Sequence, residues 1–389
     1  MKKIICLVTI LFLFVSVFSQ KKNGTLKIGV FAPLYLDSIF DGNVYNYGKK
    51  FPKFAVQGID FVQGAQIALD SFPIENSSFD LFIYDTKSDS LSIEKLINNE
   101  KINNLNLIIG AVKDEEFDQL AAFSKDKEIP FISATYPNDG GVTFDPYLTI
   151  LNPTLKTHCQ SIFSYLLQNQ DSTKFFHVRP TGSQEDRVSG YFENINKLDK
   201  KKLLNIKTIK LDSNYTSIRN QLDSNRNNFI IGGSLDESFV NELYTTLSNT
   251  DKKYKITLIG MPNWEGFSSL NKKIRDSQRN LSYIYTSPYY NDKTDSISKL
   301  LQEIYLNNYK GKPSEFAYKG FEIMYNFSRI LNENPKQFTK HINNNSYKLF
   351  TDYKILPVGN EKKTRSIDYY ENKQLYFLKK SKSGISKLE

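Results

Sequence analysis

One repeating unit constrains the fold more than any other feature: an apolar strand, a polar loop and an amphipathic helix recur along the chain. Runs that predict strands lie at residues 26–31, 79–84, 105–109, 130–133, 174–178, 204–211, 228–231 and 255–259. Predicted helices lie between them, at residues 58–69, 92–97, 116–125, 158–167, 185–198, 218–222 and 237–247. Strands and helices that alternate in this way form parallel sheets through right-handed crossovers. Because the series occurs twice, we expect an α/β protein with two doubly wound, Rossmann-like lobes.

The chain after residue 283 departs from this pattern. It predicts an extended crossing segment at residues 285–290, helices at 296–308 and 315–331, and short β-like pieces at 353–357, 366–370 and 374–378. A length of 389 residues also exceeds what one hydrophobic core usually supports. We expect an N-terminal lobe from residues 20–152 with 288–335, and a C-terminal lobe from residues 153–287 with 336–389.

The first residues are typical of a signal for export. Lys2 and Lys3 precede an apolar run at residues 4–17, and Val17 and Ser19 are the small residues that a signal peptidase reads. The run is shorter than the roughly 20 apolar residues that a membrane-spanning helix needs. We expect a signal peptide at residues 1–19, cleavage after Ser19, and a periplasmic protein without a stable membrane anchor. An uncleaved anchor is the alternative.

Cysteine, histidine and charge exclude several classes of site. Of the two cysteines, Cys6 lies in the predicted signal, so Cys159 would be alone and no intrachain disulfide or cysteine-based zinc site is expected. The three histidines lack metal-ligand spacing, and we expect neither a metal nor a cofactor. The net charge of +9 comes from lysines scattered among polar residues, which indicates solvated faces rather than a nucleic-acid surface.

No catalytic constellation stands out, and we expect no enzyme and no catalytic residues. His158 and Cys159 are sequence neighbours and would point in different directions on a helix. A nucleophile elbow, a phosphate-binding loop and a dinucleotide fingerprint are missing from the sequence. His177 lies within an apolar strand and is predicted to be a core histidine with satisfied hydrogen bonds. A carboxylate pair for glycoside hydrolysis stays open, because Asp and Glu are abundant and nothing singles one out.

Several short motifs, in order and at characteristic spacing, resemble the type I periplasmic binding proteins of the branched-chain amino-acid receptor kind. They lie at residues 28–34, 64–69, 107–110, 129–135 and 305–325. The pattern is similar to a Bacteroidetes subgroup that is often fused to LysM modules, although no LysM repeat is visible here. The resemblance implies two lobes joined by crossing segments, with a small ligand held in the cleft. It also implies an ABC permease or an envelope sensor as partner.

The candidate ligand-binding residues follow predicted strands, because open parallel sheets bind ligands beyond the carboxyl ends of their strands. In the first lobe these residues are Tyr35, Ala111, Val112, Ser133, Ala134, Thr135 and Tyr136. The resemblance implies hydroxyl residues after Gly110 for an amino-acid carboxylate. The loop after Gly110 instead reads Ala-Val-Lys and then turns acidic. Lys113 is a substitute partner for a carboxylate, or the acids simply favour a helix N-terminus.

In the second lobe the candidates are Arg179, Ser234, Glu237 and Trp264. The resemblance places Glu237 against a ligand ammonium, and the alternative is a helix N-terminal charge. Arg179 would pair with an anionic ligand or form a salt bridge across the lobes. Trp264 is either an aromatic residue of the cleft or an anchor at the domain surface.

We therefore expect an exported solute-binding protein that takes a small polar ligand, amino-acid-like or another small solute, for uptake or sensing. The alternative is an envelope scaffold, associated with the cell wall, that has the same fold and no small ligand. The atypical loop after Gly110 and the basic charge favour this alternative.

Overall fold

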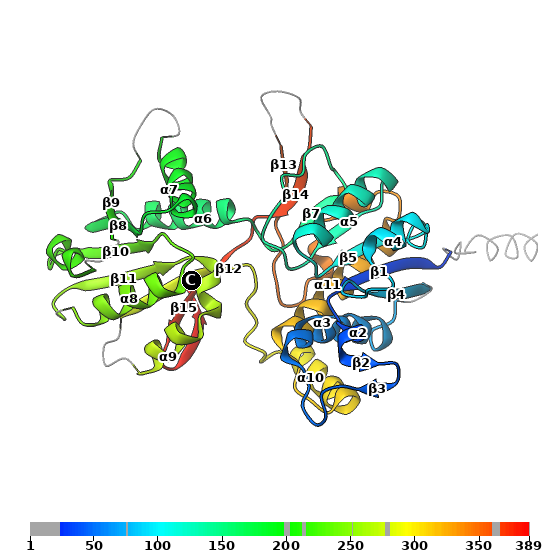
Figure 1. Ribbon diagram of the computed structural model, residues 1–389. Helices are drawn as coiled ribbons and strands as arrows, with labels where there is room; N and C mark the ends of the chain where they lie inside the picture. Colours follow the sequence, from blue (N-terminus) through cyan, green and yellow to red (C-terminus); the bar gives the residue numbers. More distant parts are fainter. Residues whose placement is uncertain are drawn as a thin grey trace, which may run out of the picture. The chain divides into compact units, whose positions relative to one another are not determined.

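The computed structural model describes residues 24–74, 77–197, 203–211, 215–250, 252–276, 281–359 and 366–388. Within these residues the strands form two seven-stranded sheets and one two-stranded hairpin (Figure 1). The strands are β1 (Leu26–Ala32), β2 (Phe40–Asp41), β3 (Val44–Tyr45), β4 (Phe79–Asp85), β5 (Leu107–Gly110), β6 (Phe131–Ser133), β7 (Leu148–Ile150), β8 (Thr173–Arg179), β9 (Ile206–Lys210), β10 (Asn227–Gly232), β11 (Lys255–Gly260), β12 (Ser282–Ser287), β13 (Ile355–Val358), β14 (Tyr369–Asn372), β15 (Tyr376–Ser381) and β16 (Gly384–Lys387).

Helices lie between most successive strands, as expected for crossover connections. The α-helices are α2 (Leu36–Ile39), α3 (Lys53–Asp70), α4 (Ile93–Asn98), α5 (Asp114–Lys127), α6 (Leu155–Gln168), α7 (Ser183–Asn196), α8 (Glu237–Ser248), α9 (Ser268–Asp276), α10 (Ser296–Tyr309), α11 (Glu315–Glu333) and α12 (Phe338–His341). The 3₁₀ helices are η2 (Tyr215–Gln221), η3 (Pro262–Gly266) and η4 (Asn345–Tyr347).

The first sheet has the strand order β13-β14-β7-β6-β5-β1-β4. β1 and β4 run parallel, with Leu26 opposite Phe79 and Ala32 opposite Asp85. β13 and β14 pair in antiparallel fashion, so a hairpin from the tail extends this parallel sheet. Pro357 lies in β13, the edge strand, where its missing N–H costs no hydrogen bond of the ladder.

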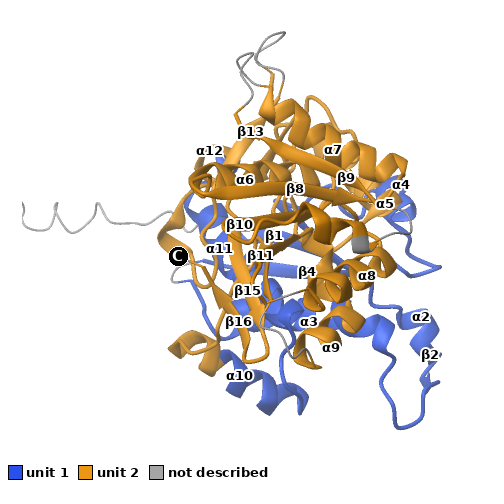
Figure 2. Cartoon of the chain, turned by 90° about the vertical axis from the view of Figure 1, so that its left-hand side faces the viewer, with its two compact units in different colours: residues 1–109, 301–338 blue, residues 110–300, 339–389 orange. Residues whose placement is uncertain are grey.

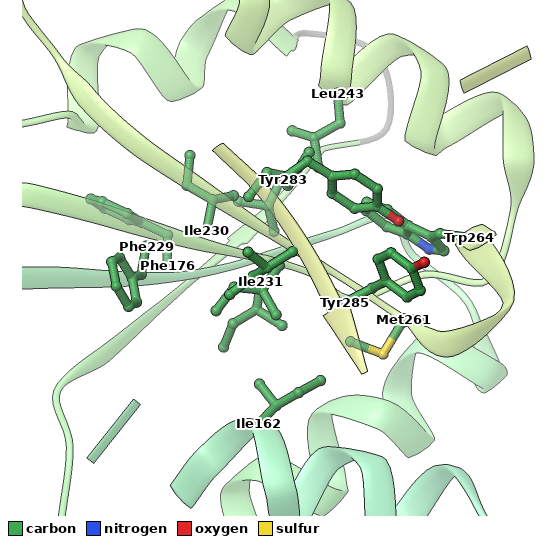
Figure 3. Close-up of a cluster of buried hydrophobic side chains, with 14 of the residues drawn as sticks. Ile162, Phe176, Phe229, Ile230, Ile231, Leu243, Met261, Trp264, Tyr283 and Tyr285 are labelled. Atoms are coloured by element: carbon green, nitrogen blue, oxygen red, sulfur yellow. The ribbon is translucent and has the colours of Figure 1, made fainter. Parts of the chain in front are cut away.

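The second sheet has the strand order β16-β15-β12-β11-β10-β8-β9. β8 to β12 are parallel, whereas β15 and β16 add an antiparallel edge. The chain leaves β8 toward β9 and then returns to β10 on the other side of β8, so the order reverses between β8 and β10. Helices cover both faces, and Figure 3 shows Ile162 of α6 and Leu243 of α8 on opposite sides of the strands.

The helices α3 and α11, which are far apart in sequence, pack closely against each other. A Cβ atom at Gly64 of α3 would lie 1.9 Å from the carbonyl oxygen of Ala317 in α11. A Cβ atom at Gly320 of α11 would lie 2.0 Å from the carbonyl oxygen of Phe61. Only glycine permits the backbones to come this close, because any larger side chain would overlap the opposite helix.

The α/β architecture with two mostly parallel sheets confirms the expected fold class. Differences occur in the connections. Residues 36–45, expected within a long polar loop, contain α2 and the β2–β3 hairpin, whose strands are too short for a periodicity signal. The helix expected at 218–222 is the 3₁₀ helix η2, and the strand β7 and the helix α9 were not predicted.

The chain divides into two compact units (Figure 2). The first unit comprises residues 1–109 and 301–338, and the second comprises residues 110–300 and 339–389. The lobe boundaries expected from the sequence stay a prediction. The predicted signal peptide at residues 1–19 lies outside the described residues. Among the helices of the described segments, none combines the length and the apolar character that crossing a bilayer requires.

Candidate ligand-binding site

Ten of the eleven predicted binding residues lie in the second unit, and four of them lie at the end of β6 or directly after β5 and β6. Ala111 is half-buried, whereas Val112, Ser133 and Ala134 are buried. The main-chain N–H of Ala134 donates to Gly110 O at 2.9 Å, and its carbonyl oxygen accepts from the Tyr289 hydroxyl at 3.1 Å. Ser133 Oγ has no hydrogen-bond partner within the described ranges.

Thr135 and Tyr136 continue this loop, and both are half-buried. The carbonyl oxygen of Thr135 accepts from Asn152 Nδ2 at 2.7 Å. The Tyr136 hydroxyl donates to Asp114 Oδ1 at 3.0 Å, and burial, followed by this contact with Asp114, raises the pKa of Tyr136. Asp114, at the start of α5, therefore orients a tyrosine, and its φ of 52° is a conformation that few non-glycine residues adopt.

Tyr35 lies in the first unit, directly after β1. Its main-chain N–H donates to Asp85 Oδ1 at 3.1 Å, and its left-handed backbone, with φ 58°, begins α2. Its ring contacts Phe54 edge-on, with centroids 5.0 Å apart. Tyr35 thus belongs to an aromatic cluster on the loop between β1 and α3.

Arg179 and Ser234 lie at the carboxyl ends of β8 and β10, where the strand order reverses. The side chain of Arg179 is almost fully buried, and its Nη2 donates to Asp186 of α7 at 2.5 Å. Ser234 Oγ donates to Oε1 of the buried Glu185 at 2.8 Å. Both polar groups are therefore engaged by the N-terminal part of α7.

His177 lies beside this cluster and differs from the expectation of a satisfied core histidine. It is buried as expected, but its Nε2 has no hydrogen-bond partner in the described segments. The atom faces the backbone after β10, since a Cβ atom at Gly233 would lie 1.9 Å from it. Burial, aided by the charge of Arg179, lowers the pKa of His177 to about 4, so the ring is neutral at physiological pH.

Glu237 at the start of α8 is half-buried and already has partners. Its Oε1 accepts from the hydroxyl of Ser269 and, at 3.4 Å, from the main-chain N–H of Ser269 in α9. The neighbouring Asp236 caps α8, and its Oδ1 accepts from the main-chain N–H of Phe239 at 2.8 Å. Glu237 therefore connects two helices of the second unit.

Trp264 is fully buried in the core of the second unit, with its ring against Tyr283 (Figure 3). Its Nε1–H donates to Ser234 O at 2.8 Å. A Cβ atom at Gly232 would lie 2.1 Å from the indole, so the glycine leaves space for the ring. The burial fits neither the cleft aromatic nor the surface anchor that the sequence suggested, because the ring exposes no surface to a ligand. For all eleven residues, a role in ligand binding stays a prediction.

A cavity of about 740 Å³ opens in the second unit, and its size suits a small molecule. It begins directly after Tyr136 and involves α6, α7, β13 and β14. The lining residues are Pro137, Asn138, Asp139, Thr154, Leu155, Lys156, Gln160, Arg187, Tyr191, Pro357, Val358, Gly359, Ser366, Ile367, Tyr369, Glu371 and Lys373. None of the eleven predicted residues lines it.

The two carboxylates of this cavity are engaged by other groups of the chain. Glu371 is 1% exposed, forms an ion pair with Lys373 and accepts from Thr157 Oγ1 at 2.7 Å. Asp139 Oδ2 accepts from the Tyr369 hydroxyl at 2.9 Å. Burial, and then the charge of Asp139, raises the pKa of Tyr369, so the phenol stays protonated and remains a donor.

Four further polar side chains of the cavity come in two pairs, each four residues apart on one helix. Lys156 and Gln160 lie on α6, and Arg187 and Tyr191 lie on α7, which packs against α6. Neither Lys156 nor Arg187 has an ion-pair partner in the part of the chain that the structure describes. The sequence did carry a signal for Arg187 and Tyr191, because α7 begins directly after the loop that follows the predicted strand β8. It carried none for Lys156 and Gln160, because α6 follows β7, which was not predicted.

Cys159 and His158 lie outside the cavity and are buried. Burial raises the pKa of Cys159 to about 12 and lowers that of His158 to about 3. The thiol is therefore protonated at neutral pH, and His158 Nδ1 forms a hydrogen bond with Thr286 Oγ1 at 2.7 Å. A cluster of metal-binding side chains is not found among the described residues.

Comparison with known proteins identifies the fold. No protein-family model and no curated protein sequence matches the chain. Among solved structures, the leucine-binding protein LivK from Thermotoga maritima has a TM-score of 0.55 at 13% identity, over 94% of this chain and 98% of its own. A putative branched-chain amino acid ABC transporter from Rhodospirillum rubrum has a TM-score of 0.66 at 10% identity, over 94% and 100%.

An ABC transporter substrate-binding protein from Desulfitobacterium hafniense, in complex with Leu, has a TM-score of 0.57 at 12% identity, over 94% of this chain and 100% of its own. The expected Bacteroidetes subgroup stays a prediction. At identities this low the likeness concerns the fold, which agrees with the two mostly parallel sheets described above. The chain has the α/β fold of the leucine-binding-protein-like, type I periplasmic binding proteins.

Proposed function

We propose that this protein is an exported solute-binding protein that binds a small polar ligand for uptake or sensing. The observation that carries the proposal is the cavity of about 740 Å³ lined mainly by polar side chains, in a chain with the fold of substrate-binding proteins. Cavities of roughly 300–1,000 Å³ with a few convergent polar groups hold small ligands. Polar groups of this kind line the cavity on the side chains of Gln160, Arg187 and Tyr191.

The proposal includes the absence of catalysis. The described cysteine and two of the described histidines are buried in states that suit packing: a protonated Cys159 and neutral His158 and His177. The three similar structures are substrate-binding or transporter-associated proteins by their names. We therefore propose a binding protein and not an enzyme.

Export through the predicted signal peptide, a periplasmic location and an ABC permease or envelope sensor as partner belong to the same proposal. Two of the similar structures are named as parts of ABC transporters, which supports the permease. The alternative of an envelope scaffold is not favoured, because the similar structures are solute-binding proteins.

The test is ligand identification followed by a cavity variant. Native mass spectrometry of protein purified from its own periplasm should show a bound small molecule. A thermal-shift panel of amino acids, small acids, sugars and peptides should raise Tm, since saturating ligand at 100 times Kd adds about 2.7 kcal/mol of stability.

The variant Gln160→Trp fills the cavity from α6 and should remove the shift. The matched control is Gln168→Trp, an exposed residue at the end of the same helix and outside the cavity. A panel without any hit, together with mass spectrometry that shows no bound molecule, would contradict the proposal.

A further inference from the structure

We infer that the cavity of the second unit selects a small oxyanion, a carboxylate or a phosphate, held between Lys156 and Arg187. The inference rests on the proposed function and names the class of ligand for that site. It comes from the pairing of charges around the cavity, which leaves an excess of one sign.

The negative charges of the cavity are compensated within the chain. Glu371 accepts from the main-chain N–H of Thr154 at 2.8 Å and from Thr154 Oγ1 at 2.9 Å, in addition to Thr157 and its ion pair with Lys373. Asp139 receives the Tyr369 hydroxyl at 2.9 Å and the main-chain N–H of Gly141 at 3.0 Å. These carboxylates have limited capacity left for a ligand ammonium group.

The positive charges are not compensated in the same way. The cavity is lined by the cations Lys156, Arg187 and Lys373, and only Lys373 has a carboxylate partner within the described segments. The side chains of Lys156 and Arg187 are both exposed to solvent, and an anion that binds between two cations is attracted by both. The favoured ligand is therefore negatively charged.

Lys156 and Arg187 would contact an anion in different ways. Arg187 presents the planar fork of a guanidinium, which matches the two oxygens of a carboxylate or phosphate. Lys156 supplies a compact ammonium on the neighbouring helix. Gln160 and Tyr191, one turn further along each helix, contribute neutral polar groups for the rest of the ligand. A volume of about 740 Å³ accommodates an organic acid larger than the bare anion.

The experiment is titration calorimetry with charged probes and neutral analogues. Succinate, citrate and inorganic phosphate are compared with succinamide, which has the shape of succinate without its charge. We expect binding of at least one anion and none of succinamide. A preference for succinate and citrate identifies a carboxylate, and a preference for phosphate identifies a phosphate ligand.

The variants Lys156→Gln and Arg187→Gln should each weaken the anion's affinity by about tenfold, since each removes a charge-assisted hydrogen bond. The controls are the single variants Lys299→Gln and Arg275→Gln, each of which removes one positive charge from an exposed residue outside the cavity. Their affinity should stay within about twofold of the parent, as expected for screened distant charges.

A neutral or cationic ligand found by native mass spectrometry, with affinity unchanged in both variants, would overturn the inference and leave the proposed function standing. Failure of every probe, together with no bound molecule, would overturn both. Equal loss of affinity in the control variants Lys299→Gln and Arg275→Gln would also overturn the inference, because the effect would then come from net charge.

Discussion

Glu371 accepts hydrogen bonds from both the main-chain N–H and the hydroxyl of Thr154, a residue 217 positions earlier in the chain, at 2.8 and 2.9 Å. The carboxylate thereby satisfies the start of α6, where an anion is favourable next to the unpaired N–H groups. It ties β14, from the tail, to the helix that carries Lys156. The shape of the cavity thus depends on a buried contact between distant segments.

Replacing this carboxylate should destabilise the protein. Glu371→Ala leaves Lys373 and two threonine hydroxyls without their acceptor, and we expect a loss of about 3 kcal/mol in the free energy of unfolding. Urea unfolding measures the loss. Glu242→Ala, at an exposed position of α8, is the control and should change stability by less than about 0.5 kcal/mol. Equal stability of the two variants would refute the role of Glu371.

The buried histidines should make the free energy of unfolding fall with pH already between pH 7 and pH 5, above the pH range in which carboxylates titrate. The folded state keeps His158 and His177 neutral, with pKa values of about 3 and 4, whereas the unfolded state takes up protons near pH 6.5. Stability is therefore complete above pH 6.5 and falls as the pH drops below it. Between pH 7 and pH 5 we expect a loss of about 2 kcal/mol for each histidine, measured by urea unfolding at both pH values.

The variant His177→Leu separates the two histidines. It should remove about half of this pH dependence and cost little at pH 7, because Nε2 of His177 makes no hydrogen bond with a described residue. An unchanged pH dependence in the variant would show that His177 is not the titrating group.

Replacing glycine by alanine should have opposite effects on stability at Gly64, where α3 packs closely on α11, and at Gly190, which lies in open space on α7. Gly64→Ala would place Cβ 1.9 Å from the Ala317 carbonyl oxygen and should destabilise the first unit by about 2 kcal/mol or more. Gly190→Ala in α7 meets nothing within 4 Å and should stabilise the protein by about 1 kcal/mol through helix propensity. Thermal unfolding of the two variants checks the signs, and a gain at Gly64 would contradict the packing.

Trp264, the only tryptophan of the chain, reports directly on the core of the second unit. Its fluorescence emission should be blue-shifted and resist quenching by iodide in the folded state, and both properties should disappear in urea. Trp264→Ala should cost about 4 kcal/mol, because it opens a large cavity and removes the hydrogen bond to Ser234. Ready quenching in the folded protein would instead place the indole at a surface.

The alternation of strands and helices sufficed to predict the fold class, since period and strand length are local properties. Of the strands β1 and β4–β12, most start and end within two residues of the predicted bounds. The β2–β3 hairpin and β7 escaped because two or three residues cannot display a period. Strand-end loops were also predictable, because the topology of parallel sheets places them at one edge.

The sequence by itself determined that this chain forms two parallel sheets with helices between the strands, because burial on both faces requires continuous apolar runs. Only the tertiary structure decided which candidate side chains already have partners within the chain or are enclosed by its core. Arg179 pairs with Asp186, Glu237 binds Ser269, and Trp264 is enclosed by the core. Such pairings depend on how separate strands, loops and helices pack against one another, and the period of a single element does not encode them. The tertiary structure also decided that Lys156 and Arg187 line the cavity without an ion-pair partner among the described residues.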